Sequence, residues 1–488
     1  MSQGMEGLLF IDGKFTEASD GGRFDVINPA NEEVVGSVAD ATLKDVDAAV
    51  SAARRAFDET SWSHDRHFRR TCLLQLQEAL RKEVQGFREI QTAEAGITTS
   101  ALVTQVDGNI NDISYDVDMI DSFGWETDFP IYERGGFRSY RRVRYEPYGV
   151  LGAITPWNAP FALNLWKSIP GLATGNTIVL KTAPDTPLAG VMLARVVQEQ
   201  TDIPEGVFNV ISSYDNAIAG DGLTADPRVD MYHFTGSVPV GQRIAERAAI
   251  GLRKVVLELG GKSANIVLDD ADLDTAIPFS VRSCMSNAGQ GCLKPTRMIA
   301  HASVYDEVLE RLAANINSMV VGDPRDPKTD MGPIIRRAQV EKIAGFVDRA
   351  RSDGARVVVG GKIPDVGGKG FWYEPTVVAN VDENAEIAQN EVFGPVLVVI
   401  KYDGDDNEAV RIANNTRYGL SGYVQTRDTD RAFRIANRLR TGTVNIGRSM
   451  SMSVDTPFGG WGISGLGREH GEEGWREFLQ SKTIASPA

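Results

Sequence analysis

Short apolar runs and amphipathic stretches alternate regularly between residues 150 and 259. The apolar runs predict strands at 150–155, 177–181, 207–211, 229–234 and 255–259. The stretches between them predict a helix that begins at Pro160 and further helices at 187–200, 216–224 and 238–249. Five strands alternating with helices through short links predict a doubly wound parallel sheet, which binds ligands at the carboxyl ends of its strands.

The regions on either side of this one continue the pattern. Thr42 and Asp45 resemble a capping box that opens an amphipathic helix, and a second helix is predicted over 64–85. Beyond residue 262, helices are predicted at 304–319, 336–351, 405–415 and 428–440, and strands at 356–359, 396–401, 421–425 and 443–446. The fold class is therefore α/β, with a second α/β domain after the first.

Residues 136–148 break this regularity. Aromatic and β-branched residues alternate there with arginines, which predicts an exposed strand or arm. Such a segment suits either an oligomer contact or a nucleic-acid patch. The chain carries 51 Lys and Arg against 66 Asp and Glu, a net charge of −15, which argues against nucleic-acid binding and against attachment to anionic membranes. The oligomer contact is the favoured interpretation.

Composition limits the remaining classes. Three cysteines in 488 residues do not form a disulfide framework, and neither they nor the five histidines show metal-ligand spacing, so no metal is expected. No run of 18 apolar residues occurs, so no membrane-spanning helix is expected. A cytoplasmic enzyme is the expectation, and one cysteine is the candidate for chemistry.

Cys292 is that candidate, because it follows the flexible segment Gly289-Gln-Gly and is poorly placed to be a packed core residue. A thiolate is the nucleophilic form of cysteine, so Cys292 would need activation. Glu258 ends an apolar strand just before two glycines. It is either a satisfied carboxylate at the sheet edge or a desolvated general base.

Two further motifs follow strand ends. Asn158 can donate to a developing oxyanion, or it can cap the helix that begins at Pro160. Phe234-Thr-Gly-Ser237 with Gly241 places a turn of small residues at a helix start, where backbone N–H groups attract a pyrophosphate.

Taken together, these motifs resemble the NAD(P)-dependent aldehyde dehydrogenase family over nearly the whole chain. The matching segments are Thr155-Pro-Trp-Asn158, Phe234-Thr-Gly-Ser237, Leu257-Glu-Leu-Gly-Gly-Lys262, Gly289-Gln-Gly-Cys292, Glu391-Val-Phe-Gly-Pro395 and Pro457-Phe-Gly-Gly460.

The resemblance implies an oxidation of an aldehyde to a carboxylic acid. Cys292 would attack the aldehyde carbon to give a thiohemiacetal, whose oxyanion Asn158 and the Cys292 N–H would hold. Hydride transfer to NAD(P) would leave a thioester, and Glu258 would activate the water that hydrolyses it. The implied cofactor residues are Thr155, Pro156, Trp157, Lys181, Pro184, Gly220, Phe234, Gly236, Ser237, Leu259, Glu391 and Phe393.

The resemblance also implies three parts. Residues 1–125 and 149–260 would bind the cofactor, 261–460 would form the catalytic domain, and 126–148 with 475–488 would form an oligomerisation element. A homodimer or homotetramer would follow.

Two departures from the family pattern concern the cofactor. The usual Gly-x-Gly turn after the strand at 207–211 is absent, and only Gly220 matches it. A Glu commonly follows three residues after Lys181, where this chain has Pro184. We expect NAD as the preferred cofactor, with NADP use possible.

Other functions are compatible with the same cysteine. A CoA-acylating dehydrogenase or a thioesterase-like hydrolase is one alternative, although acylating relatives lack the Glu equivalent to Glu258. A non-enzymatic structural relative is another, although Cys292, Glu258 and Asn158 are all present.

The expected substrate site is apolar. Leu163, Trp166, Met452 and Phe458 would line it and favour a medium or long aliphatic, or an aromatic, aldehyde. Arg448 is either a ligand for a distal carboxylate or a solvated loop residue.

Overall fold

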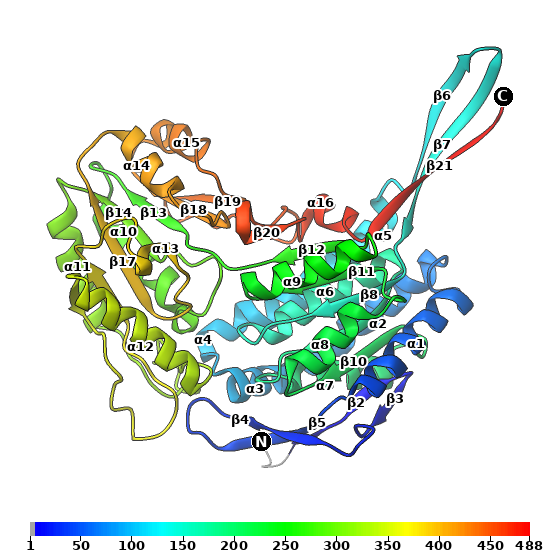
Figure 1. Cartoon of the computed structure of the whole chain (residues 1–488), viewed down its shortest axis with the longest axis horizontal. Helices are drawn as coiled ribbons and strands as arrows, with labels where there is room; N and C mark the ends of the chain where they lie inside the picture. The colour runs from blue at the N-terminus through cyan, green and yellow to red at the C-terminus, as the bar shows by residue number, and fades with distance from the viewer. Residues whose placement is uncertain (1–4) are drawn as a thin grey trace.

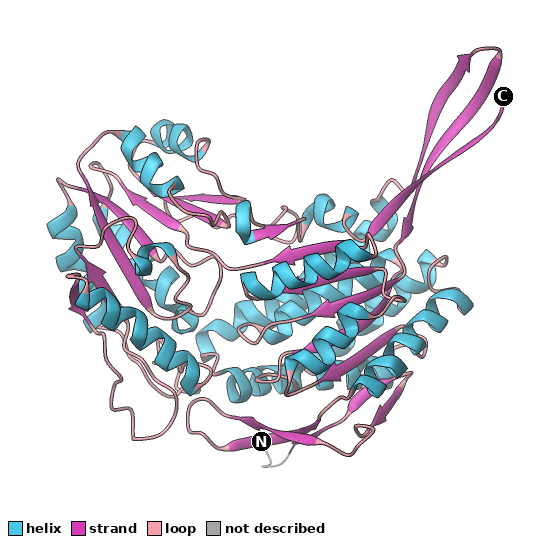
Figure 2. Cartoon of the chain, viewed as in Figure 1, coloured by secondary structure: helices cyan, strands magenta, loops and turns pink. Residues whose placement is uncertain are grey.

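A computed structural model describes residues 5–488 and shows two α/β lobes joined side by side, with a β-arm that projects from one of them (Figure 1). Helices cover both faces of the central sheet in each lobe (Figure 2). This confirms the predicted fold class.

The first lobe is built on an eight-stranded sheet of order β20-β12-β11-β8-β9-β10-β2-β3. Its five central strands pair in parallel and correspond to the five predicted apolar runs, while β2, β3 and β20 add antiparallel edges. The strands are β2 Leu9–Ile11, β3 Lys14–Thr16, β8 Val150–Ile154, β9 Thr177–Thr182, β10 Phe208–Ser212, β11 Met231–Thr235, β12 Lys254–Glu258 and β20 Gly465–Leu466.

Helices of the first lobe come from two parts of the chain. Those that link the parallel strands are α6 Pro160–Thr174, α7 Leu188–Gln200, α8 Asn216–Ala225 and α9 Val238–Ile250. Those before the sheet are α1 Leu43–Glu59, α2 Arg66–Lys82, α3 Val84–Ala95, α4 Thr99–Leu102, the π-helix η1 Val103–Gly108 and α5 Asn109–Ser122. The capping box predicted at Thr42 and Asp45 is present at the start of α1.

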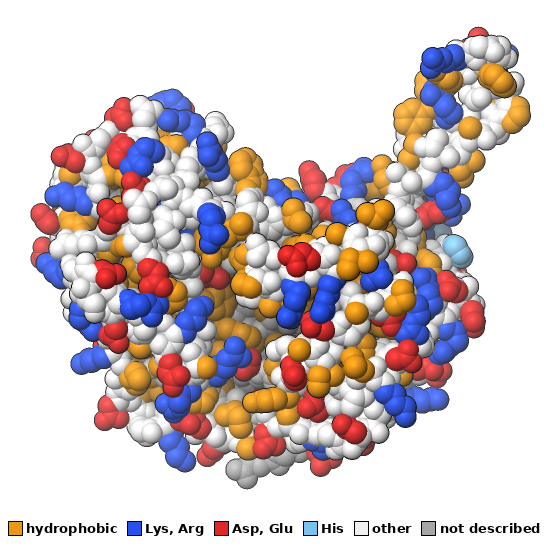
Figure 3. Space-filling model, viewed as in Figure 1, with side chains coloured by type: hydrophobic (Ala, Val, Ile, Leu, Met, Phe, Trp, Pro, Cys, Tyr) orange, Lys and Arg blue, Asp and Glu red, His pale blue; other side chains and the backbone are white. Residues whose placement is uncertain are grey.

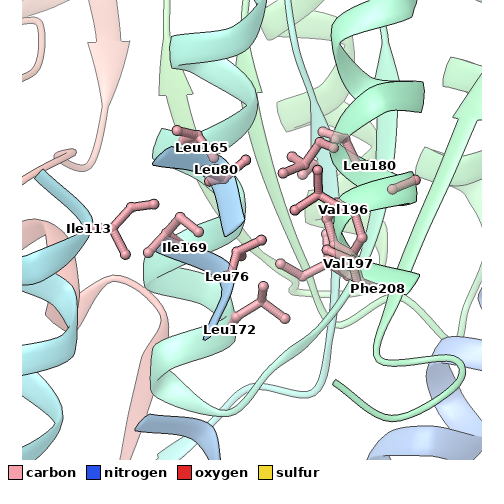
Figure 4. Packing of buried hydrophobic residues seen from close by; sticks show 14 of the residues in the cluster. Leu76, Leu80, Ile113, Leu165, Ile169, Leu172, Leu180, Val196, Val197 and Phe208 are labelled. Carbon is pink, nitrogen blue, oxygen red and sulfur yellow. The ribbon is translucent and has the colours of Figure 1, made fainter. Parts of the chain in front are cut away.

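The core of this lobe lies where α2, α6 and α7 pack against the sheet (Figure 4). Leu76 of α2, Leu165 of α6 and Leu180 of β9 are among the fully buried side chains there. This packing fixes the carboxyl ends of the strands relative to α6. A small separate sheet contains β1 Met5–Gly7, β4 Arg23–Ile27 and β5 Val34–Ala39.

The second lobe contains a seven-stranded sheet of order β15-β16-β17-β14-β13-β18-β19, parallel except at β15. Its strands are β13 Ala264–Val267, β14 Arg297–His301, β15 Arg356–Val359, β16 Thr376–Ala379, β17 Val396–Tyr402, β18 Ser421–Gln425 and β19 Thr443–Ile446. Its helices are α10 Leu273–Met285, the 3-10 helix η2 Ser286–Gly289, α11 Tyr305–Asn317, α12 Arg337–Ser352, α13 Glu386–Gln389, α14 Asp406–Asn414 and α15 Thr429–Ala436. Strands β13, β14 and β16 were not predicted from the sequence. Strands of four or five residues show little periodicity, although the equally short β15, β18 and β19 were predicted.

The arm is a three-stranded antiparallel sheet of β6 Glu126–Arg134, β7 Phe137–Pro147 and β21 Leu479–Pro487. It projects well beyond the first lobe (Figure 1), as predicted for an exposed arm. The last segment, with η3 Gly462–Ser464 and α16 Gly471–Arg476, returns the chain from the second lobe to the first, where β20 pairs with β12. The functional division predicted at 125, 149, 260 and 460 stays a prediction, and residues 1–4 lie outside the described residues.

Candidate active site

Cys292 follows a tight turn between α10 and β14. Asn287, Ala288 and Gly289 have φ values of 54°, 51° and 69°. A Cβ at Gly289 would lie 2.1 Å from the carbonyl oxygen of Gly394, so only glycine fits there. The turn therefore holds the cysteine loop against the segment that follows α13.

The three cysteines differ in exposure. Cys72 and Cys284 are completely buried, whereas Cys292 is half-buried, as the sequence predicted. Burial, together with the carboxylates of Glu391 and Glu258, raises the pKa of Cys292 to about 12. The thiol is thus protonated near neutral pH and needs a proton acceptor or a bound cation before it can act as a nucleophile.

Asn158 lies beside this loop. Its side-chain Nδ2 donates to the backbone carbonyl oxygen of Gln290 at 3.1 Å. Its backbone carbonyl oxygen accepts a hydrogen bond from Asn287 Nδ2 at 2.9 Å. The N-cap of α6 is Ala159, so the alternative interpretation of Asn158 as a helix cap is wrong. The amide of Asn158 is tied instead to the residue two positions before Cys292.

Glu258 ends β12 with 2% of its surface exposed, and neither carboxylate oxygen has a hydrogen-bond partner among the described residues. The interpretation as a satisfied edge carboxylate is therefore wrong. Burial raises its pKa well above the usual value, and the negative charge of Glu469 raises it further, while Lys167 and Arg468 oppose the shift. A carboxyl whose pKa is raised in this way is a stronger base than an ordinary glutamate.

Sequence reasoning missed a buried group of charges beneath Glu258. Lys167 Nζ donates to Glu469 Oε1 at 2.6 Å and to Thr235 Oγ1 at 2.6 Å. His233 Nε2 lies 2.8 Å from the same Glu469 oxygen, and Thr235 is the register partner of Glu258. The sequence offered two signals for this group, namely a lysine (Lys167) within the apolar α6 and a histidine (His233) within the apolar β11.

The charges in this group follow from its geometry. Burial alone would raise the pKa of Glu469, but Lys167 and His233 outweigh it and hold that pKa below its usual value. Burial lowers the pKa of His233 to about 4, with a further contribution from Lys167. Glu469 is therefore ionised and His233 neutral at physiological pH.

Glu391 approaches the same region from the second lobe. Its Oε1 accepts from the Gly261 N–H at 2.9 Å, and a Cβ at Gly260 would lie 2.3 Å from its Oε2. The two glycines after Glu258 thus allow the Glu391 carboxylate to approach the backbone. Burial raises the pKa of Glu391 to about 7, although Gly261, Lys342 and Lys262 oppose the shift.

Two aromatic rings meet between the lobes. The centroids of Trp157 and Phe393 are 5.2 Å apart at an interplanar angle of 89°. Phe393 has a φ of 57°, and its carbonyl oxygen accepts from Gln339 Nε2 at 2.8 Å. Rings from opposite lobes therefore form one wall that a flat ligand could contact.

Lys181 closes β9 and is almost fully buried, with its Nζ bonded to Asn216 Oδ1 at the start of α8. Burial lowers its pKa to about 8. Pro184 follows it in the next turn, and the adjacent Asp185 forms an ion pair with Arg336. Arg336, which precedes α12, is a cation that the local sequence around Lys181 could not reveal.

The turn after β11 lies next to Glu258. Gly236 N–H donates to the Glu258 carbonyl oxygen at 3.0 Å, and Ser237 caps α9 without a side-chain hydrogen bond. A Cβ at Gly241 would lie 2.5 Å from Leu259, so α9 packs closely against the strand end. The first N–H groups of α9 are therefore not used by the Ser237 side chain.

Residues of the two lobes meet at Trp157 and Phe393 and at Gly261 and Glu391, and we call this boundary between the lobes the cofactor crevice. The other predicted cofactor residues fit it to different degrees. Thr155 Oγ1 donates to Asn164, which orders the segment through Pro156. Phe234 is buried in β11. Gly220 lies within α8, where a Cβ would meet nothing within 4 Å, so no close approach requires a glycine there.

The predicted substrate residues lie on α6 and on the loop before β20. The rings of Trp166 and Phe458 are 6.4 Å apart, Leu163 is buried, and Met452 is half-buried. His470 also packs edge-on against Trp166 at 4.5 Å. The site is thus less purely apolar than the sequence predicted.

Among residues 5–488, no group of three or more His, Cys, Asp or Glu side chains could hold a metal ion. The described helices also include none that is long and apolar enough to cross a bilayer.

Comparison with known proteins shows which family the chain is similar to. The model of the aldehyde dehydrogenase family matches residues 15–484. The 3-succinoylsemialdehyde-pyridine dehydrogenase of a Pseudomonas species is 39% identical over 98% of this chain and 98% of its own length. Aldehyde dehydrogenase 1 of Tanacetum cinerariifolium is 36% identical over 98% of this chain and 95% of its own.

Solved structures agree with this result. An NAD+ complex of an aldehyde dehydrogenase from Bacillus cereus superimposes with a TM-score of 0.95 at 32% identity, covering 99% of this chain and 97% of that one. Betaine aldehyde dehydrogenase from Staphylococcus aureus, also with NAD+, gives 0.95 at 33% identity, covering 99% of this chain and 95% of the other. The chain belongs to the aldehyde dehydrogenase family.

Proposed function

We propose that this protein oxidises an aldehyde to the carboxylic acid, with NAD as the preferred hydride acceptor. The observation that carries the proposal is the convergence of three groups at the crevice between the lobes. These are the half-buried Cys292, the Asn158 amide tied to its loop and the buried, unpartnered carboxyl of Glu258.

Cys292 Sγ attacks the carbonyl carbon, which forms a C–S bond and leaves the former carbonyl oxygen negative. The Asn158 amide and the Cys292 N–H donate to that oxygen, which stabilises the thiohemiacetal. Because the resting thiol is protonated, its proton must leave first. The charges of three carboxylates, those of Glu391, Glu258 and Glu469, act on Cys292.

The residues around the crevice fit a dinucleotide. Lys181 and Asn216 offer polar groups at the end of β9, the N–H groups of α9 can bind a pyrophosphate, and Glu391 can accept from ribose hydroxyls. NAD+ held by these residues would supply the hydride acceptor for the thiohemiacetal carbon. The chain's part is to hold the aldehyde carbon on Cys292 while Trp157 and Phe393 bound the crevice.

Hydrolysis of the thioester completes the reaction. An ionised Glu258 takes a proton from water, the water oxygen attacks the acyl carbon, and Cys292 leaves as a thiolate. The unpartnered carboxylate oxygens of Glu258 are free to accept from that water. This favours hydrolysis over transfer to CoA, which needs no such base.

The substrate class is an apolar or aromatic aldehyde of medium or larger size. Trp166 and Phe458 support it, since the rings of these two predicted substrate residues lie 6.4 Å apart. Arg448 is exposed and could contact a distal carboxylate of an aldehyde acid.

The arm supports a homodimer or homotetramer. It exposes large apolar side chains (Figure 3), which are typical of surfaces that pack against another chain. These are Phe129, Ile131, Tyr132, Phe137, Tyr140 and Ile484. Two fully buried, unpaired thiols, Cys72 and Cys284, are consistent with the reducing cytoplasm.

The test is a stoichiometry measurement on a panel of aldehydes of graded length, with and without a terminal carboxylate. Each mole of aldehyde consumed should yield one mole of NADH and one of acid without CoA. A strict requirement for CoA, or NADH formation without acid, would overturn the proposal.

A further inference from the structure

A second cavity lies in the second lobe, at the amino ends of β13, β14 and β18. Its volume is about 690 Å3 including the mouth. The residues Lys262 to Ala264, Arg297, 413–414, 416–422, 439–441, Trp461 and Gly462 line it.

The charge of this lining is of one sign. Lys262, Arg297, Arg417 and Arg440 all contribute to it, and no Asp or Glu does. In a chain with a net charge of −15, four cations around one cavity without a carboxylate are unusual. The glutamate that acts on Lys262, Glu391, belongs to the cofactor crevice and does not line the cavity.

Two polar groups of this lining lack partners. Lys262 Nζ and Ser263 Oγ are both more than nine-tenths buried and make no hydrogen bond to residues 5–488. A buried ammonium without a hydrogen-bond partner is costly, and such groups in proteins are normally paired. Burial and the nearby charge of Arg297 lower the pKa of Lys262 to about 7, against the weaker pull of Cys284 and Glu391.

The three arginines of the cavity lining have N–H donors that are free to bind a ligand. Arg297 is buried and donates to the carbonyl oxygens of Lys262, Ile412 and Ala413, which uses only part of its five N–H donors. Arg417 and Arg440 are exposed and form no ion pair with the described residues. Buried cations inside and free guanidinium groups outside would draw an anion in and hold it.

We propose that this cavity binds a small tetrahedral oxyanion of the phosphate class, at a site separate from the cofactor crevice. The ligand would accept from Lys262 Nζ and Ser263 Oγ within the cavity, with Arg440 and Arg417 at its mouth. Binding needs no turnover, so it can be measured on the inactive Cys292→Ala enzyme and stands apart from the proposed oxidation.

The test is calorimetric titration of the full-length enzyme with sodium phosphate at constant ionic strength. The titration is repeated with saturating NAD+, which removes any phosphate binding at the pyrophosphate position of the cofactor. We expect one saturable site per chain that persists with NAD+, with a dissociation constant of about 1 mM or lower. Parallel titrations with sulfate and acetate separate a tetrahedral dianion site from a site for any anion.

Two variants and a control locate the site. Lys262→Met removes the buried ammonium and should weaken phosphate binding by about tenfold or more. Arg440→Ala changes only an exposed residue of the mouth, so it keeps the proposal testable if Lys262→Met does not fold, and it should weaken binding severalfold. Lys328→Met, an exposed lysine outside the cavity, should leave binding unchanged. No saturable binding, binding that NAD+ abolishes, or equal binding by Arg440→Ala and the control would overturn the proposal and indicate an adventitious ion only.

Discussion

Lys167 Nζ lies 2.6 Å from Glu469 Oε1, both side chains are buried, and Lys167 also donates to Thr235, the register partner of Glu258. The pair leaves a negative charge close to Glu258 that raises the pKa of its carboxyl, while Lys167 itself acts in the opposite direction. Burial is the main cause of the raised pKa of Glu258, and Glu469, which lies 211 positions away in the sequence (the difference between 469 and 258), raises it further.

This relationship predicts the pH profile of a Glu469→Gln variant. Removing the negative charge lowers the pKa of Glu258, because the repulsion is lost and Lys167 is no longer neutralised. Glu258 acts as a base only when ionised, so the rise of deacylation with pH should move to lower pH. Steady-state hydrolysis of an activated ester by the enzyme measures this step without hydride transfer. Glu472→Gln, an exposed acid on α16, removes the same charge and should not move the profile. A shift to higher pH in Glu469→Gln would contradict the electrostatic explanation.

Cys292→Ala should abolish aldehyde oxidation, by more than about 10^4-fold in kcat, because it removes the nucleophile. NAD+ binding, followed by fluorescence titration, should survive. Cys284→Ala is the matched control, since that thiol is completely buried and its pKa is raised to about 12 by burial. Substantial turnover in Cys292→Ala, with loss in Cys284→Ala, would show that the nucleophile is assigned wrongly.

The cofactor preference depends on the turn after Lys181. A carboxylate at position 184 would accept from the ribose hydroxyls of NAD and repel a 2′-phosphate, and Pro184 does neither. We therefore expect NAD to be preferred with measurable NADP use. Pro184→Glu should reduce kcat/KM for NADP by about tenfold or more through like-charge repulsion, whereas Pro184→Gln should not. A hundredfold preference for NADP in the natural chain would instead point to a phosphate ligand such as Arg336.

If the exposed apolar side chains of the arm hold an oligomer together, charged residues in their place should disrupt that oligomer. Phe129 pairs with Arg141 and Ile484 with Arg142, so the two apolar side chains lie on opposite faces of the arm. Replacing both with Asp should shift the protein to monomers in sedimentation velocity experiments. Val320→Asp, at an exposed valine elsewhere, should not. A natural chain that sediments as a monomer at all concentrations would contradict the oligomer proposal.

The sequence predicted best those features that depend on neighbouring residues along the chain. The five strands of the first sheet could be predicted because apolar runs and amphipathic helices alternate there, and the exposure of Cys292 followed from its glycines. Lys167, His233 and Glu469 could not be placed, because the ion pair joins residues 302 positions apart, the separation of 167 and 469. Nothing local distinguishes a lysine in α6 that meets a buried carboxylate from one that reaches solvent.

The interpretations that the structure overturned have the same origin. An Asn two residues before a helix proline has the sequence of a cap, and only the Cys292 loop, brought in from residue 287 onward, gives its amide another partner. Glu258 at a strand end could have been satisfied by a neighbouring turn. Its missing partner is a property of the assembled site and is invisible in the sequence.

Glu258→Gln should separate the two halves of the reaction. Acylation and hydride transfer need Cys292, whereas release of the acid needs a base for water, so a burst of NADH should remain with kcat lowered by about 10^2 to 10^4-fold. Loss of the burst together with turnover would mean that Glu258 acts earlier, in activating Cys292.

The Glu258→Gln variant also allows the thioester on Cys292 to be trapped, which tests the proposed reaction most directly. Glu258→Gln enzyme is mixed with NAD+ and an aldehyde, quenched in acid during the burst, and analysed by intact mass and peptide mapping. We expect one acyl group per chain, attached to Cys292, in an amount equal to the NADH formed. NADH formation with no adduct, or with the acyl group on Cys72 or Cys284, would contradict it.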